Sequence, residues 1–168
     1  MIKIGKNISS FSTYSYRPAS KKELISIIKS RMFEEGLNCD LSDIDTSLIT
    51  DMSWLFYNSS FNGNISNWNV SNMKDMTAMF RNATFNGDIS KWNVSNVEKM
   101  ESMFYKSKFN GDISRWDTSS VTTMYWMFAS SKFNQDISNW NVRQDCVTYN
   151  MFNGCSIKEK HKPKVLQR

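Results

Sequence analysis

The chain has 168 residues, of which 40% are apolar and 14% aromatic, and this composition predicts one folded domain and excludes a disordered chain. The formal net charge is +5, but residues 1–36 and 157–168 hold twelve Lys/Arg against four Asp/Glu, whereas residues 37–156 hold nine against twelve. Because the basic excess lies only in the flanks, it disfavours nucleic acid as the partner of the body of the chain.

Residues 1–36 are predicted to form an N-terminal segment that ends in an amphipathic capping helix. Ser20 is the expected N-cap, Glu23 completes a capping box, and Gly36 ends the helix. No secretory signal is present in MIKIGKNISSFSTYSY, and no window has the roughly 18 apolar residues that a membrane span requires. We therefore expect a cytoplasmic protein without a membrane span. The alternative is a bacterial cell surface, if the protein has an export signal that the given sequence does not include.

Residues 37–156 contain five units of 24 residues without an insertion. The stretch FNGDISKW at 85–92 has close copies at 61, 109 and 133. A fixed period with constant apolar columns is typical of a solenoid, in which each unit buries its apolar side against the next. One such column holds Trp68, Trp92, Trp116 and Trp140, which we expect to be stacked in the core.

Each unit has two halves of different character. In DISKW, Ile89 stands between polar neighbours, as in a short strand. In SNVEKMESMF, the apolar residues follow helical spacing, and Ser95 with Glu98 fits a capping box. The sequence therefore predicts an α/β solenoid of five strand-plus-short-helix repeats with parallel stacked short strands. Residues 157–168 are expected to be a basic C-terminal tail.

The sequence offers little for catalysis. Its only histidine is His161, in the tail, so the body has no base for a nucleophile, and no nucleotide-binding motif is present. We expect no enzyme, no cofactor and no metal site, and we expect the three cysteines to be free thiols. One column, Asp88, Asp112 and Asp136, has three interpretations: the favoured one is hydrogen bonding to turn backbone, the second is a ladder for a cation or a partner, and the least favoured is a catalytic carboxylate pair.

Partner-binding residues are expected where the units differ. Around the MF or LF pair, large aromatic and basic side chains interrupt otherwise small columns, and such residues are favoured at protein interfaces. These candidates are Trp54, Tyr57, Arg81, Tyr105, Lys106, Tyr125 and Trp126. A second variable surface would carry Lys91 and Arg115.

The unit FNGDISxWNVSNVxxMxxMF closely resembles the repeat of BspA-like leucine-rich-repeat proteins, in particular the mycoplasma-type repeat of unknown function. The resemblance covers residues 37–156. It implies a leucine-rich-repeat-like solenoid, usually on a bacterial surface, that binds proteins and carries no catalytic residues.

Together these features predict a protein–protein interaction module, such as an intracellular inhibitor or adaptor of a kind that a virus or phage encodes. The first alternative is an adhesin-type binding protein of a bacterial surface. The second is binding of nucleic acid or an anionic surface through the flanks, with contacts from Lys158, Lys160, Lys162, Lys164 and Arg168. A monomer is the favoured state.

Overall fold

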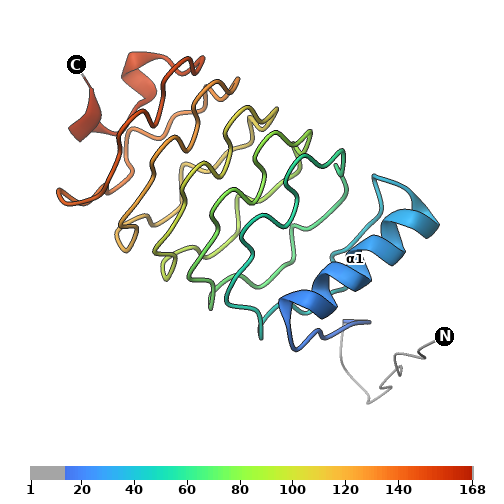
Figure 1. Cartoon of the computed structure of the whole chain (residues 1–168). Helices are drawn as coiled ribbons and strands as arrows, with labels where there is room; N and C mark the ends of the chain where they lie inside the picture. The colour runs from blue at the N-terminus through green and yellow to red at the C-terminus, as the bar shows by residue number, and fades with distance from the viewer. Residues whose placement is uncertain (1–13, 168) are drawn as a thin grey trace.

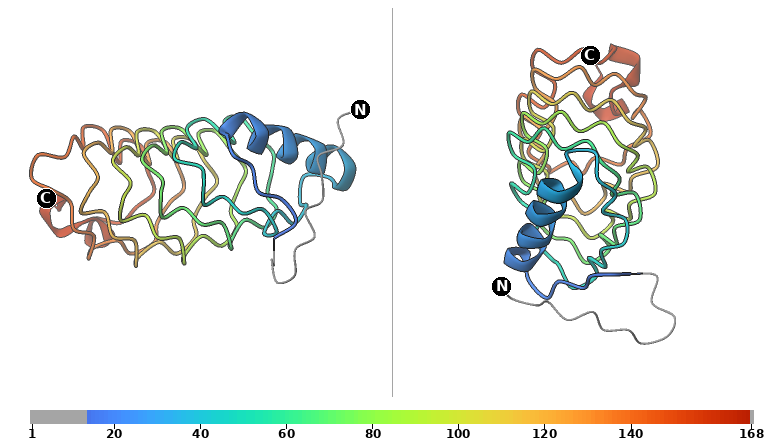
Figure 2. Two further views of the ribbon diagram at one scale, coloured as in Figure 1. Left: turned by 90° about the horizontal axis from the view of Figure 1, so that it is seen from below. Right: turned by 90° about the vertical axis from the view of Figure 1, so that its right-hand side faces the viewer.

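The computed structural model describes residues 14–167. In this part of the protein the chain winds through successive 24-residue coils that stack along one axis (Figures 1 and 2). A single long helix, α1, lies across the first coil, and two short 3-10 helices lie at the other end. Residues 1–13 of the predicted N-terminal segment, and Arg168 of the predicted tail, lie outside the described residues.

The predicted N-terminal helix is present as α1, Lys21–Glu35. Ser20 Oγ accepts a hydrogen bond from the N–H of Glu23. The Glu23 carboxylate accepts one from the N–H of Ala19, whereas a capping box would place this contact at the N–H of Ser20. Gly36, with a φ of 89°, ends the helix. No helix of the described residues is both long and apolar enough to cross a membrane. The buried face of α1 consists of Leu24, Ile27 and Ile28.

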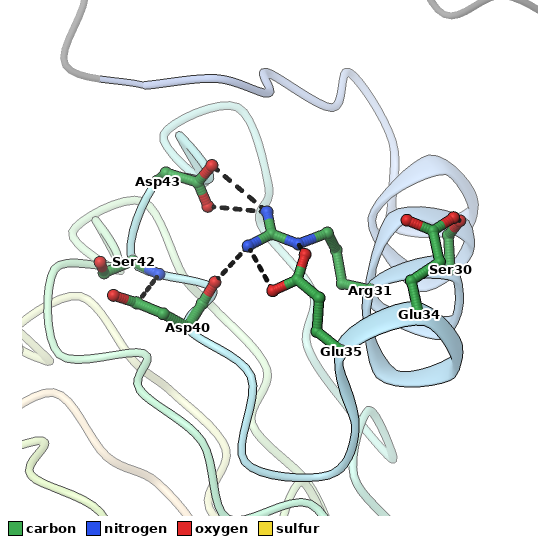
Figure 3. A network of polar contacts seen from close by, with 7 residues as sticks. All are labelled: Ser30, Arg31, Glu34, Glu35, Asp40, Ser42 and Asp43. Atoms are coloured by element: carbon green, nitrogen blue, oxygen red, sulfur yellow. Dashed lines mark hydrogen bonds and ion pairs between the residues drawn. The ribbon is translucent and has the colours of Figure 1, made fainter.

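Arg31 ties α1 to the first coil, as Figure 3 shows. Its guanidinium forms an ion pair with Glu35 on the helix. It forms a second with Asp43 on the coil, with 3.1 Å between Nη1 and Oδ1. It also donates to the backbone carbonyl of Asp40, at 2.7 Å. The hydrogen bonds to Glu35 and the nearby Asp43 carboxylate raise the pKa of Arg31 above its usual range. Charge-assisted, bidentate contacts of this kind set the orientation of a helix as well as its position.

The prediction of stacked strands was wrong, and with it the α/β solenoid. Residues 14–167 contain no β-strand and no sheet, only isolated parallel bridges between neighbouring coils and one between Tyr16 and the first coil. In the expected strand, the Ser90 N–H donates to Asp88 Oδ1 in a local turn. The carbonyl of Ile89 accepts from the Trp92 N–H of its own coil and from the Trp116 indole of the next. These groups are therefore not free to form a strand ladder.

The predicted short helices of the repeats were also wrong, because α1 is the one α-helix among the described residues. The expected capping boxes do not form. Ser95 donates from both its N–H and its hydroxyl to Asn93 Oδ1, and Glu98 pairs with Lys74 of the preceding coil. The segment that follows is a series of overlapping turns.

In these turns, successive backbone N–H groups alternate between two kinds of acceptor. The N–H groups of Met103, Tyr105 and Ser107 each bond to the carbonyl three residues back. The intervening N–H groups bond to the next coil at 2.8–3.0 Å; the donors are Met100, Ser102, Phe104 and Lys106, and the acceptors are the carbonyls of Thr123, Tyr125, Met127 and Ala129. These seven backbone donors are thus all used, without a helix or a strand.

The alternation requires two left-handed residues per coil, four positions apart. In the third coil these are Ser102 and Lys106, each with a φ of 53°. Each is the second central residue of a turn, where positive φ defines the type II geometry. The same two positions recur in the other coils as Trp54 and Asn58, Ala78 and Asn82, Trp126 and Ser130, and Asn150 and Gly154.

Stacked aromatic rings run through the core along the coil axis. Phe56, Phe80, Phe104, Phe128 and Phe152 stack in series with centroids 5.5–5.8 Å apart. The four consensus tryptophans are buried, and each indole N–H donates to a backbone carbonyl of the preceding coil. The expected core position of the Trp column is confirmed. Each coil is thus joined to its neighbours by backbone, indole and ring contacts together.

After the fifth coil the chain keeps the same register for five further residues. Ile157 is buried, 24 residues after Phe133, and the Lys158 N–H donates to Asn134 Oδ1 as in the preceding coils. The carbonyl of His161 accepts the Ile137 N–H at 2.9 Å. The two 3-10 helices are η1, Glu159–His161, and η2, Lys164–Leu166. This segment covers one half of the last coil.

Candidate functional site

The aspartate column is made of local turns. The carboxylates of Asp88, Asp112 and Asp136 each accept the backbone N–H of the serine two residues later, at 2.9 Å. These hydrogen bonds from the serines lower the pKa of all three aspartates. Asn64 forms the same turn with Ser66, so the contact needs an acceptor and not a charge. The geometry agrees with the structural interpretation of this column.

Residues 14–167 contain no group of three or more His, Cys, Asp or Glu side chains that could hold a metal ion. His161 instead contacts the carbonyl of Asn134 through Nδ1, at 3.0 Å. The three cysteines are free thiols. Burial raises the pKa of Cys39 and Cys146, which disfavours the reactive thiolate form.

Four of the nine predicted binding residues come together with Tyr149 in one surface, which we call the aromatic band: Arg81, Tyr105, Tyr125, Trp126 and Tyr149. The guanidinium of Arg81 lies 4.3 Å from the centroid of the Tyr105 ring. Tyr105 stacks on Trp126 at 5.4 Å, Trp126 on Tyr125 at 5.2 Å, and Tyr125 on Tyr149 at 5.9 Å. The series crosses from the second coil to the fifth.

The other predicted residues lie around or apart from the band. Lys106 is exposed, with Nζ 5.3 Å from the centroid of Tyr105. Trp54 and Tyr57 contact each other edge to face at 5.1 Å in the first coil. Lys91 and Arg115 are exposed on another segment of the coil, near Asp88 and Asp112, whose pKa values they help to lower.

Two members of these surfaces stand where the backbone is strained. Trp54 and Trp126 have φ values of 61° and 55°. A left-handed backbone costs a residue with a side chain about 1–2 kcal/mol, and a bulky residue is unusual there. The equivalent positions of other coils hold Ala78, Ser102 and Asn150. Strain of this kind is often kept at functional sites.

Trp126 has a second unfavourable feature. Its indole Nε1 is buried and has no hydrogen-bond partner within residues 14–167. An unsatisfied buried donor destabilises a fold by about 1–3 kcal/mol. The backbone strain and the unsatisfied donor thus oppose the stability that Trp126 gains by stacking on Tyr105 and Tyr125.

The comparison with protein families matches most of the chain. The model described as "Mycoplasma protein of unknown function, DUF285" matches residues 28–108 and 106–162. The chain belongs to this family. No curated protein and no solved structure that was compared matches it. The DUF285 assignment agrees with the mycoplasma-type repeat of the resemblance, whereas the wider BspA-like leucine-rich-repeat assignment stays a prediction.

The turn geometry of the DUF285 repeat was missed at the sequence level, although it left a signal. The second left-handed column reads Asn58, Asn82, Lys106, Ser130, Gly154, and asparagine and glycine are the residues that favour positive φ. A periodic Asn/Gly column inside an expected helix argues for turns. The first column, Trp54, Ala78, Ser102, Trp126 and Asn150, has no such signal, so the strain at its two tryptophans was not visible in the sequence.

Proposed function

We propose that this DUF285 chain is a protein-interaction module that binds its partner through the aromatic band, and that its role is binding and not catalysis. The observation that carries the proposal is the series of ring contacts from Arg81 to Tyr149 across four coils. Tyrosine, tryptophan and arginine are the side chains that contribute most to binding free energy at interfaces.

The exposure of the band supports this role. Tyr149 is 68% exposed, and Arg81, Tyr105, Tyr125 and Trp126 are half-buried. Half-burial fixes these side chains against the coils before a partner arrives, so little conformational entropy is lost on binding. Trp54, 52% exposed, and Tyr57 extend the candidate surface in the first coil.

The unfavourable position of Trp126 points the same way. A partner that offers an acceptor could satisfy its buried indole N–H after a small side-chain shift, and ring burial would then offset the backbone strain. We infer that the strain and the unsatisfied donor are tolerated because the residue contributes to binding.

Other features favour one form of this role. Three free thiols fit a reducing compartment, which favours an inhibitor or adaptor inside a cell over a surface adhesin. The basic flanks give less support to nucleic-acid binding, because three cations of the N-terminal flank and Lys162 of the C-terminal flank are already in ion pairs. These pairs are Arg17–Asp45, Lys21–Asp51, Arg31–Asp43 and Lys162–Glu159.

The test compares three forms of the chain in one capture experiment with host extract. The forms are the wild type, a band variant with Tyr105→Ser and Trp126→Asn, and a control variant with Lys91→Ser and Arg115→Ser. Asparagine suits the left-handed position, as Asn150 shows at φ 55°, so the band variant should remain folded. The captured proteins are cross-linked to the chain and quantified by mass spectrometry. We expect one host protein to be captured by the wild type and by the control but not by the band variant.

The opposite pattern would overturn the proposal. If the captured protein were lost with Lys91→Ser and Arg115→Ser but kept with the band variant, the binding surface would be the one that carries Lys91 and Arg115. Circular dichroism of all three forms, with equal unfolding midpoints, excludes unfolding as the cause of a loss.

A further inference from the structure

The last coil exposes a row of unused backbone donors. In the fourth coil, the N–H groups of Met124, Trp126, Phe128 and Ser130 donate to carbonyls of the fifth, at 2.8–3.2 Å. The equivalent donors of the fifth coil are Thr148, Asn150, Phe152 and Gly154. Their N–H groups have no acceptor anywhere in residues 14–167. The fifth coil therefore presents the donors for one more coil-to-coil contact, with no acceptors opposite them.

Three residues of this row, Thr148, Asn150 and Phe152, line one wall of a groove. The groove has a volume of about 770 Å³ and lies between residues 148–153 and the C-terminal segment. Its second wall contains Lys162, Val165, Leu166 and Gln167. Val165 is 69% exposed although it is apolar. The C-terminal segment lies at this end of the stack (Figure 1), and the groove separates it from residues 148–153.

The aromatic ladder also ends in this groove. Phe152 stacks on Phe128 at 5.8 Å and is half-buried, whereas the inner rings of the ladder are buried on both faces. Lys162 Nζ lies 5.8 Å from the centroid of Phe152. In every earlier coil an aromatic ring of the next coil stacks on the equivalent phenylalanine. The groove therefore offers the Phe152 ring, over which Lys162 Nζ lies, together with three of the four donors.

From these observations we infer that the groove binds a segment of another protein that carries the same turn pattern as the repeat. Such a segment presents carbonyls on alternate residues, a phenylalanine that stacks on Phe152, and left-handed turns at asparagine and glycine. An ordinary extended strand does not match, because the donors lie on a chain of consecutive turns and not on a strand. The contact continues the coil-to-coil interface that the molecule already makes, in the manner of strand addition at a sheet edge.

A second folded copy of this chain is a poorer occupant. Its carbonyls at residues 147–153 are already bonded to its own fourth coil, and α1 lies over its first coil (Figure 2). Lys21 of that helix contacts Asp51 and Ser53, on the segment whose carbonyls a copy would have to offer. The carbonyls of residues 51, 53, 55 and 57 accept no hydrogen bond within residues 14–167, but Phe56 between them is buried, so a copy has no ring to stack on Phe152. The groove therefore fits a segment from a different protein.

The test uses the whole chain and a fluorescent peptide with the sequence of residues 145–156, with both cysteines replaced by serine. The control peptide carries Asn150→Val and Gly154→Val as well, because β-branched residues resist the left-handed turns. We expect saturable binding in fluorescence anisotropy for the first peptide and at least about tenfold weaker binding for the second. Equal binding of both peptides, or of neither, would overturn the inference.

Two protein variants test the donor row itself. Thr148→Pro removes one unused N–H, and Thr148→Ala is its control; the proline should weaken binding about fivefold relative to alanine. If Thr148→Pro unfolds, Val165→Arg, which places charge and bulk in the groove from the other wall, should abolish binding while the unfolding midpoint is kept. Undiminished peptide binding by Val165→Arg would place the contact elsewhere. A dimer in sedimentation that Thr148→Pro dissociates would assign the edge to a second copy, against our inference.

Discussion

Tryptophan side chains occupy two different environments in this stack. The consensus tryptophans are buried and donate their indole N–H to the preceding coil, as Trp116 does to the carbonyl of Ile89 at 3.2 Å. Trp54 and Trp126 stand instead at left-handed positions on the surface. Residue type alone therefore does not distinguish a structural tryptophan from a candidate binding one, whereas its backbone conformation does.

The first prediction concerns the buried indoles. Trp116→Phe removes the hydrogen bond to Ile89 but keeps an aromatic ring, and it should lower the free energy of unfolding by about 1–2 kcal/mol. Trp54→Phe, at a surface position, should change it by less than about 0.5 kcal/mol. Urea denaturation measures both, and equal effects would contradict the structural role of the indole.

The aspartate column predicts how stability depends on pH. Hydrogen bonds from the serines lower the folded pKa of Asp88, Asp112 and Asp136 below the unfolded value of about 3.9. Their stabilising contribution is therefore fully present above that value and is lost as the pH falls through the folded pKa values. We expect the unfolding free energy to decrease below about pH 4.

The matched variant replaces all three aspartates with asparagine, which forms the same turn at Asn64. Denaturation series between pH 3 and 7 should show a weaker decrease for this variant than for the wild type. An equal decrease would mean that other carboxylates cause the acid sensitivity.

At the scale of the element, the sequence pattern predicted α1 and the 24-residue register but not the conformation inside a coil. The helix has its own capping residues, Ser20 and Gly36, so local rules suffice. In the repeats, Val97, Met100, Met103 and Phe104 have helical spacing because four buried side chains must face the core. Overlapping turns bury the same residues, and the choice between the two depends on hydrogen bonds to the next coil, which no local pattern reveals.

The binding candidates were partly predictable for a related reason. Large side chains that interrupt a column, such as Tyr105 and Trp126, were visible in the sequence. Their stacking in one series depends on how neighbouring coils align, and the strain at Trp126 depends on a left-handed turn that the predicted helix concealed. The open donor row of the last coil could not be derived at all without the turn geometry.

Ser130 provides the test of this element, because it is exposed and has a φ of 54°. Ser130→Val should unfold with roughly 1–2 kcal/mol less stability than Ser130→Gly, since only glycine adopts a left-handed turn without steric strain. In a helix the order would be reversed, because glycine is the poorer helix former. Thermal or urea denaturation of the pair therefore distinguishes turns from the helix that spacing suggested.

At the scale of the whole molecule, each coil contacts mainly its neighbours, so position along the stack decides how much a residue contributes. Phe104, in the middle, has aromatic rings on both sides, at 5.6 Å from Phe80 and 5.5 Å from Phe128. Phe152, at the end, stacks on Phe128 and has one face toward the groove. The core is therefore continuous, but its two ends differ from its middle.

Alanine substitutions test this difference. Phe104→Ala should destabilise the protein by about 3–5 kcal/mol, the range for a fully buried phenylalanine. Phe152→Ala should have roughly half that effect, because its side chain is half-buried. Equal losses of unfolding free energy for the two variants in urea denaturation would show that position along the stack does not decide how much a phenylalanine contributes.

The most direct test of the account is the affinity of a recovered partner for three forms of the chain. Isothermal titration calorimetry should give a dissociation constant at least about 30-fold higher for Tyr105→Ser/Trp126→Asn than for the wild type, the loss expected of one interface hot spot. The Lys91→Ser/Arg115→Ser control should stay within about threefold of the wild type. An unchanged affinity for the first variant, with the fold intact, would contradict the claim that the aromatic band is the binding surface.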